Sequence, residues 1–293
     1  MIKHKFGKVV LIGEPNVGKS SLVNKIVRGA VSVVTDIPGT TREQIRGIKT
    51  TPNYQIVFMD TPGMHAARNS LQKFMSKSIS HALAEADLIL YVLDATDIKE
   101  EHLNKIKNYE KTGKPLVLAI NKADKTNFEK LYPTLEKVKS LSFIKETIPT
   151  SAKSGFNIDV LEQEIAKHLP TGKSVYEQDD FTTQTTRRMV EEIIRGALLE
   201  LLDREIPHGI AVSINKFEER PKEIEIHADI ICEKTSHRPI IIGKKGENLK
   251  AAGISARSGI QKLVGRHVKL YTHVVVREGW RDKKNMLDEL GYT

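Results

Sequence analysis

The sequence predicts a doubly wound α/β domain followed by a smaller α+β domain. Residues 1–170 alternate short β-branched apolar runs with segments of helical spacing, which is typical of a parallel sheet covered by helices. Residues 171–183 are polar and aperiodic, as expected for a linker. Residues 184–293 follow the order helix, strand, strand, helix, loop, helix, strand, which indicates a separate domain.

Length and composition agree with this division. The 293 residues suffice for two cores, and 39% hydrophobic and 28% charged residues are ordinary for globular proteins. The single cysteine, Cys232, follows two isoleucines, so we expect it in the core of a protein from a reducing compartment. No apolar run approaches the length of a membrane-spanning helix, and the N-terminus leads directly into a strand without a signal peptide.

Charge is distributed unevenly along the chain. The net charge is +9, yet residues 171–233 carry −6 and residues 234–284 carry +10. A concentrated basic segment beside an acidic one indicates a face that binds a polyanion. The alternative is a solvated basic surface, which is common.

The first motif occupies residues 13–20 and fits the phosphate-binding pattern G-x-x-x-x-G-K-[ST]. It lies between an apolar run at 8–12, predicted as a strand, and a helical pattern at 21–27. Backbone N–H groups of such a loop converge on phosphate, while Lys19 can reach the outer phosphates and Ser20 can hold Mg²⁺. A plain glycine-rich turn is the alternative. We expect nucleotide contacts from Gly13, Glu14, Pro15, Asn16, Val17, Gly18, Lys19, Ser20 and Ser21.

A carboxylate follows the next predicted strand. Gly and Pro predict a loop at 30–46, and the strand after it ends in Asp-Thr-Pro-Gly at 60–63. Asp60 is placed to hold the hydration shell of Mg²⁺, and the Gly63 N–H to contact a terminal phosphate. Thr41, from the loop, is expected to contact Mg²⁺ as well. Asp-Thr-Pro-Gly is also a common turn, so its position after the phosphate loop supports this interpretation.

The most informative motif is Asn-Lys-Ala-Asp at 121–124, directly after a predicted strand at 114–120. Asp124 can accept hydrogen bonds from N1–H and the exocyclic amine of guanine, whereas adenine would leave the carboxylate unpaired. Asn121 can serve N7 and O6 of guanine, and Lys122 can lie over the base. The loop whose backbone can approach O6 consists of Ser151, Ala152 and Lys153.

These motifs, in this order, resemble the signature set of GTPases over residues 7–169. The resemblance implies GTP and GDP as ligands and Mg²⁺ as cofactor. A phosphate-loop kinase is the alternative. Such a kinase would need an arginine-rich lid and would not need the motif at 121–124.

The second domain carries Gly-Lys-Lys-Gly at 243–246 between two helical patterns. Such a loop brings the backbone close to a nucleic-acid strand, and paired lysines add phosphate contacts. The arrangement resembles the prokaryotic, type II K-homology domain, which clamps about four nucleotides of a single strand. The G-x-x-G pattern alone is weak, and an ordinary loop is the alternative. The expected RNA contacts are Gly243, Lys244, Lys245, Gly246, Lys250 and Arg257.

The pairing of both domains resembles the Era family of GTPases over essentially the whole chain. Closely similar segments are 206–212, 241–246 and 280–292, whereas Gly39 replaces a Gln that is frequent in the family. The resemblance implies a factor for small-subunit ribosome assembly that binds the 3′ end of the small-subunit ribosomal RNA. It also implies a cytoplasmic protein with peripheral association with the inner membrane. We expect slow basal GTP turnover and a monomer.

Two other functions stay open. One is a GTP-independent RNA-binding module, although the intact Lys19, Ser20, Asp60 and Asp124 argue against it. The other is a sibling GTPase that modifies tRNA or assembles the large subunit, although such enzymes usually carry other appendages than a G-x-x-G domain.

The residues expected to assist GTP hydrolysis differ from those of many GTPases. Many GTPases orient the attacking water with a Gln directly after D-x-x-G, but here Met64 and then His65 follow. GTPases that resemble this one can use a potassium ion instead, which could replace an arginine electrostatically. Asn16 and carbonyls of residues 37–41 would be its ligands, and the alternatives are an arginine from a partner, Arg42 or Arg46. The candidate catalytic residues are Lys19, Asn16 and Thr41.

Overall fold

The structure is a computed structural model that describes residues 3–35, 37, 39–63, 69–202 and 206–292. The chain divides into two units, which are considered separately below. Unit 1 comprises residues 1–32, 41–65 and 76–183, and unit 2 comprises residues 33–40, 66–75 and 184–293. Two short segments that precede residue 170 therefore group with unit 2. The division of the sequence into 1–170, 171–183 and 184–293 remains a prediction.

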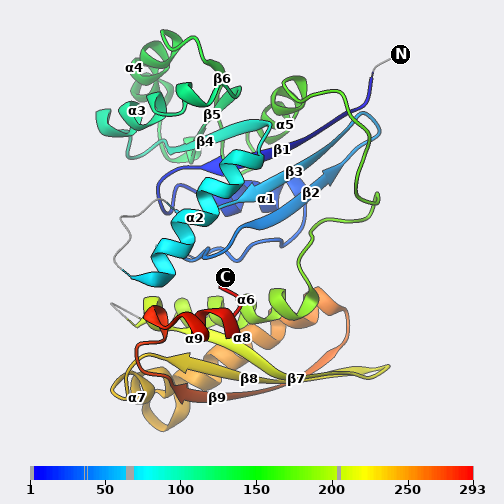
Figure 1. Cartoon of the computed structure of the whole chain (residues 1–293), viewed down its shortest axis with the longest axis vertical. Coiled ribbons are helices and arrows are strands. Elements are labelled where there is room, and N and C mark those ends of the chain that lie inside the picture. The colour runs from blue at the N-terminus through cyan, green and yellow to red at the C-terminus, as the bar shows by residue number, and fades with distance from the viewer. Residues whose placement is uncertain (1–2, 36, 38, 64–68, 203–205, 293) are drawn as a thin grey trace. The chain divides into compact units, whose positions relative to one another are not determined.

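Unit 1 is built on a six-stranded sheet with the strand order β2-β3-β1-β4-β5-β6 (Figure 1). All neighbouring pairs are parallel except β2 and β3, which are antiparallel. The strands are β1 (Lys5–Ile12), β2 (Ile45–Thr50), β3 (Tyr54–Asp60), β4 (Leu88–Asp94), β5 (Leu116–Asn121) and β6 (Ile144–Pro149). The sequence pattern did not predict β2. Arg46, which was expected in a loop, lies in this strand.

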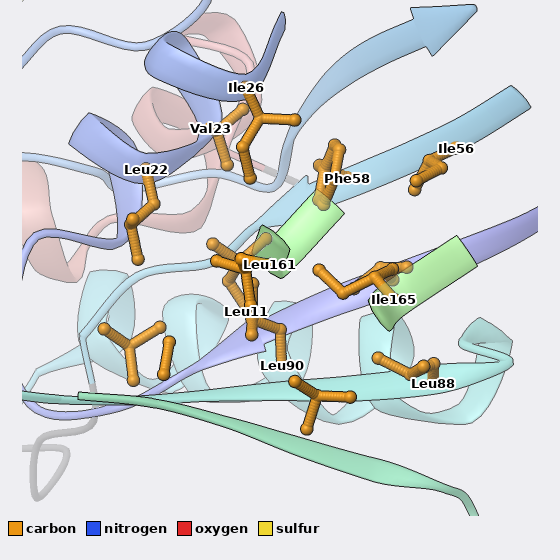
Figure 2. Close-up of a cluster of buried hydrophobic side chains, with 14 of the residues drawn as sticks. Leu11, Leu22, Val23, Ile26, Ile56, Phe58, Leu88, Leu90, Leu161 and Ile165 are labelled. Carbon is orange, nitrogen blue, oxygen red and sulfur yellow. The ribbon is translucent and has the colours of Figure 1, made fainter. Parts of the chain in front are cut away.

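Helices cover both faces of this sheet, which confirms the doubly wound α/β class. Alternation along β1 shows how: Val9 and Leu11 belong to one core cluster, and Val10 and Ile12 to the other. Figure 2 shows the first cluster, in which α1 and α5 pack on the strands. The helices are α1 (Lys19–Val27), α2 (Ser70–Glu85), α3 (Glu100–Lys107), α4 (Phe128–Lys139) and α5 (Ile158–Lys167).

Residues 171–183 form no helix or regular strand, as predicted, but they lie along unit 1. The side chain of Gln55, which is fully buried, binds this segment. Its Oε1 accepts hydrogen bonds from the Val175 and Tyr176 N–H groups at 2.8 and 3.0 Å, and its Nε2 donates to Tyr176 O at 2.9 Å. The segment is therefore bound to the sheet at residues 175 and 176.

Unit 2 contains a three-stranded sheet of order β7-β8-β9 with helices on one face (Figure 1). β7 and β8 are antiparallel and β8 and β9 are parallel. The observed order of elements confirms the predicted one: α6 (Thr186–Leu199), β7 (Ala211–Glu219), β8 (Glu223–Cys232), α7 (His237–Ile242), α8 (Glu247–Val264), β9 (His267–Val276) and α9 (Lys284–Glu289). Cys232 is buried in the core, as predicted. Trp280 is also buried, and its Nε1 donates to Gly209 O at 3.0 Å.

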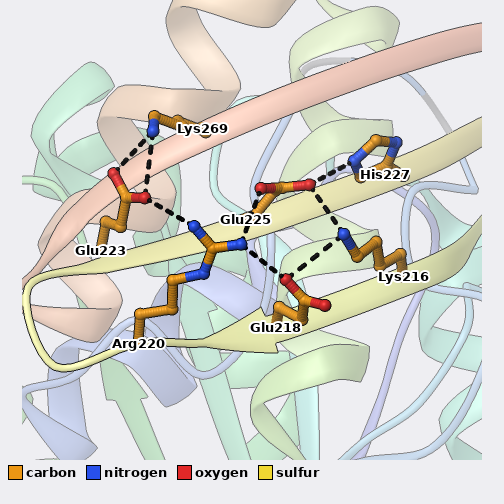
Figure 3. A network of polar contacts seen from close by, with 7 residues as sticks. All are labelled: Lys216, Glu218, Arg220, Glu223, Glu225, His227 and Lys269. Atoms are coloured by element: carbon orange, nitrogen blue, oxygen red, sulfur yellow. Dashed lines mark hydrogen bonds and ion pairs between the residues drawn. The ribbon is translucent and has the colours of Figure 1, made fainter.

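On the face of this sheet opposite α6 and α8, charged side chains form a network (Figure 3). Along β8, Ile224 and Ile226 are buried while Glu223, Glu225 and His227 point to the other side. Hydrogen bonds from Lys216 and then His227 lower the pKa of Glu225 to about 2. The positive and negative side chains of the network therefore pair with one another. Its members are Lys216, Glu218, Arg220, Glu223, Glu225, His227 and Lys269.

None of the helices among the described residues is both long and apolar enough to cross a membrane.

Candidate functional site

The loop between β1 and α1 has the geometry of a phosphate cradle. Gly18 lies at φ 92°, and a Cβ there would come within 2.2 Å of Asn121 Nδ2. A Cβ on Gly13 would lie 2.4 Å from Val92 O. Only glycine fits at these two positions, because the loop is packed tightly against β4 and β5. Its backbone N–H groups precede the N-terminus of α1, which favours an anion at this point.

Lys19 is almost fully buried beneath this loop. Its Nζ donates to Gly13 O at 3.0 Å and to Glu14 O at 2.9 Å. Burial lowers the pKa of Lys19 to about 8, and the negative charges of Asp60 and Glu14 oppose this shift. The side chain is thus folded into the cradle as a charged group at neutral pH, where an incoming phosphate can replace the two carbonyls as its partner.

Three side chains with oxygen atoms that suit a metal ion lie close together beside Lys19. Ser20 Oγ donates to Asp60 Oδ2 at 2.6 Å and lies 3.1 Å from Thr41 Oγ1. Asp60 is fully buried, and its Oδ1 has no hydrogen-bond partner among the described residues. Burial raises the pKa of this carboxyl, while Ser20 and Lys19 lower it. Hydroxyl and carboxylate oxygens with one buried atom unsatisfied fit a Mg²⁺ ion, which takes hard oxygen ligands.

Asn121 joins three loops at the end of β5. Its side chain is buried, and its Nδ2 donates to Val17 O at 2.9 Å while its Oδ1 accepts from Ala152 N–H at 3.0 Å. Lys122 continues this connection, because its Nζ donates to Asn16 O at 2.6 Å. The structure therefore brings together the phosphate loop, the 121–124 motif and the 150–153 loop, as the sequence predicted.

These loops line an open pocket of about 200 Å³. The carboxylate of Asp124 is exposed there, and a hydrogen bond from Ser151 lowers its pKa, with help from the charges of Lys153 and Lys125. An ionised acceptor at the rim suits a ring that presents two donors. The pocket is lined by Gly18, Ser21, Asn121, Lys122, Asp124, Lys125, Ala152 and Lys153. Lys125 was not predicted, because it lies outside the motif.

The remaining predicted positions are placed as follows. A Cβ on Gly63 would lie 2.9 Å from Pro15 Cγ, so this glycine lies against the phosphate loop. Asn16 is exposed at φ 60°. Met64 and His65 lie outside the described residues.

The Gly-Lys-Lys-Gly loop of unit 2 lies between α7 and α8. Gly243 has φ 77°, and a Cβ there would lie 2.8 Å from Asn248 N, so the position requires glycine. Lys245 is also left-handed, at φ 53°. Gly246 faces open space, with nothing within 4 Å of its Cβ position. The loop therefore presents exposed backbone together with the exposed side chains of Lys244 and Lys245.

Next to this loop runs a groove of about 460 Å³ between α8 and β9. Lys250 and Arg257 line it, as predicted, at exposed positions of α8. Five further lining residues were not predicted: Leu249, Gly253, Ile254, Leu270 and Thr272. One of these residues could have been noticed in the sequence, because Ile254 lies off the apolar helical pattern of α8. In the structure Ile254 is 52% exposed. A lining that combines apolar side chains with Lys250 and Arg257 can hold unstacked bases and their phosphates.

Comparison with known proteins gives the same two parts. The model of the family described as 50S ribosome-binding GTPase matches residues 8–122, and the KH domain model matches residues 205–281. GTPase Era of Caldanaerobacter subterraneus subsp. tengcongensis is 40% identical over 292 residues, which span 99% of this chain and 98% of the relative. The chain belongs to the GTPase Era family. GTPase Era of Alkaliphilus metalliredigens is likewise 40% identical, over 99% of this chain and 100% of its own.

Solved structures of Era share the complete fold. Era in complex with MgGDPNP and nucleotides 1506–1542 of 16S ribosomal RNA is 35% identical, with a TM-score of 0.94 over 99% of both chains. A variant of Aquifex aeolicus Era bound to GDP·AlF4⁻ matches with the same identity, TM-score and coverage. The resemblance to the Era family that the sequence suggested is therefore confirmed. So is the predicted order of a GTPase domain followed by a K-homology domain.

Proposed function

We propose that this protein hydrolyses GTP and binds the 3′ end of small-subunit ribosomal RNA as an assembly factor of the small ribosomal subunit. The observation that carries the proposal is the whole-chain similarity to Era bound to MgGDPNP and to 16S ribosomal RNA nucleotides. The predicted division into 1–170, 171–183 and 184–293 assigns the nucleotide to the first part and RNA to the last.

In the proposed GTP complex, the phosphates lie in the loop at 13–20 with Lys19 against the outer ones. Ser20, Thr41 and Asp60 hold Mg²⁺, which neutralises the charge of the phosphates. The guanine lies in the pocket beside Asn121 and Lys122 with Asp124 on its N1 and amine edge. Asp60 and Asn121 end β3 and β5, and Lys19 and Ser20 begin the helix that follows the loop after β1. Thr41 precedes β2, whose first residue, Ile45, pairs with Asp60, so these groups gather at the edge of the sheet where this fold binds ligands.

In the proposed RNA complex, a single strand follows the groove between α8 and β9. The exposed backbone at Gly246 admits close approach of the strand. The cationic side chains contact phosphates, while the apolar side chains that line the groove receive bases. These cationic residues are Lys244, Lys245, Lys250 and Arg257. We further infer a monomer in the cytoplasm that associates peripherally with the inner membrane, on the basis of the family resemblance.

RNA selectivity tests the proposed function against its alternatives. The purified protein with GDPNP and Mg²⁺ is titrated with three labelled RNAs of equal length, taken from the small-subunit 3′ end, the large-subunit RNA and a tRNA. We expect the small-subunit RNA to bind at least tenfold more tightly. Preference for either other RNA would favour a sibling GTPase, and equal binding with and without nucleotide would favour a GTP-independent module.

We propose that a potassium ion assists hydrolysis beside the phosphates, with the Asn16 side chain as one ligand. Its support is the phosphate-loop asparagine together with Met64 at the usual Gln position. Backbone carbonyls of residues 37–41, of which residue 38 lies outside the described residues, are the other candidate ligands. A monovalent cation there stabilises charge that develops between the β- and γ-phosphates. Basal GTP turnover is expected to be about tenfold faster in K⁺ than in Na⁺ at equal ionic strength.

Two variants that lack the side-chain amide oxygen of Asn16 serve as controls for this prediction. Asn16→Ala and Asn16→Gly both delete it, and glycine avoids the strain of a Cβ at φ 60°. Both variants should turn over GTP at the same rate in K⁺ and in Na⁺. Equal rates of the unmodified protein in the two salts, with RNA present and absent, would contradict the potassium proposal.

A further inference from the structure

Asp94, the last residue of β4, makes a contact that links two parts of the candidate nucleotide site. Its Oδ2 lies 2.6 Å from Lys122 Nζ, and the same Nζ donates to Asn16 O at 2.6 Å. The other carboxylate oxygen, Oδ1, accepts from Thr96 N–H at 2.9 Å and from the Thr96 hydroxyl at 2.7 Å. Asp94 is therefore fixed by its own turn and directs Lys122 across to the phosphate loop.

Lys122 and Asn16, whose carbonyl oxygen Lys122 Nζ binds, both have unfavourable backbone conformations. Lys122 lies at φ 61° and Asn16 at φ 60°, in the left-handed region that non-glycine residues seldom adopt. Such conformations are strained and persist only where the surroundings hold them. The ammonium of Lys122 supplies this restraint for the Asn16 peptide, since it binds that carbonyl directly.

Asp94 is suited to hold an ammonium group. Its side chain is 16% exposed, so water screens the pair less than it would on an open surface. Burial alone would raise the pKa of Asp94, but the hydrogen bonds from Lys122 and Thr96 lower it overall. The carboxylate is therefore ionised at neutral pH. Register places Asp94 beside Asn121 in the neighbouring strand, next to the motif that it supports.

We propose that Asp94 is a positioning residue that holds Lys122 against the phosphate loop and thereby slows release of the bound nucleotide. The inference rests on the proposed GTPase function. Lys122 lines the pocket of unit 1, whereas Asp94 is not one of its lining residues, so Asp94 acts through Lys122. Asn121 ties the same loops independently through Val17 O. Asp94 therefore supplies only part of the restraint between these loops.

The test is the dissociation rate of a fluorescent GDP analogue from Asp94→Asn in the full chain with Mg²⁺. Asparagine keeps the oxygen that Thr96 binds but turns an amide donor toward the ammonium. We expect dissociation about tenfold faster, with the preference for guanosine over xanthosine nucleotides unchanged because Asp124 is intact. Asp97→Asn is the matched control, since Asp97 pairs with Lys99 at 3.2 Å where both side chains are 57% exposed. This control should release the analogue at the unmodified rate.

A double-mutant cycle separates positioning from a general structural role. In a Lys122→Met background, Asp94→Asn should add less than a twofold change. The same tenfold factor in both backgrounds would overturn the proposal, as would an unchanged rate in Asp94→Asn. Asp94→Glu serves as a second variant if Asn disturbs folding: it keeps the charge, so its effect should be smaller, and an equal effect would also overturn the proposal. Failure of the unmodified protein to bind the analogue would contradict the proposed function instead.

Discussion

Asp124→Asn is expected to weaken GTP binding by about 100-fold or more and to shift preference toward xanthosine nucleotides. In the proposed complex the carboxylate accepts two hydrogen bonds from guanine, whereas a carboxamide can accept only one and places its NH2 group against the guanine amine. Polar groups left unpaired at a binding site discriminate strongly between ligands. Xanthine carries a carbonyl at C2, so the same NH2 group becomes a suitable donor. Competition titrations with GTP and with xanthosine triphosphate measure the shift.

The structure sharpens this expectation. The hydrogen bond from Ser151 lowers the pKa of Asp124, so the proposed base reader is ionised at neutral pH before ligand arrives. Asp97→Asn removes a carboxylate from an exposed ion pair in the same unit and should leave both affinities unchanged. Wild-type GTP affinity in Asp124→Asn would show that Asp124 does not read the base.

Replacing Lys244 and Lys245 together by Asp is expected to lower affinity for single-stranded RNA by about 100-fold at low salt. Both side chains are exposed on the loop, and each is proposed to contact a phosphate. Loss of two phosphate contacts should reduce the slope of log affinity against log salt by roughly 1.4, because each contact to a single strand contributes roughly 0.7. Aspartate tolerates the left-handed backbone at position 245 better than most residues.

The matched control for this pair lies in the same unit. Lys283 and Lys284 are adjacent and exposed, and their replacement by Asp makes the same change in net charge away from the G-x-x-G loop. This control should retain most of the RNA affinity, and both double variants should keep basal GTP hydrolysis. Unchanged RNA affinity in the Lys244 and Lys245 variant, or an equal loss in the control, would place the RNA site elsewhere.

The parts of the candidate site that sequence predicted are those with fixed local spacing. The phosphate loop and the 121–124 motif lie directly after apolar runs, so their meeting follows from the rule that parallel strands end at one edge. Gly18 illustrates the agreement: the motif demands glycine, and the structure shows Asn121 Nδ2 where a Cβ would stand.

Features that depend on distant contacts were not predictable. β2 reads Ile-Arg-Gly-Ile-Lys-Thr and lacks clear alternation, yet antiparallel pairing with β3 makes it a strand. Gln55 looks like a polar residue within a strand, and only the fold shows that it anchors residues 175 and 176. Asp94 ends an apolar strand with no motif of its own, and its role emerges from a contact with Lys122, 28 residues later.

The measurement that tests the central claim most directly is GTP turnover by the purified full chain with Mg²⁺, with and without RNA from the small-subunit 3′ end. ATP and an RNA of scrambled sequence are the controls. The account predicts slow release of phosphate from GTP alone, none from ATP, and a rate that changes with the small-subunit RNA but not with the scrambled RNA. Absence of GTP turnover in every condition, or turnover that small-subunit RNA does not alter, would contradict a single protein that joins GTP hydrolysis to recognition of this RNA.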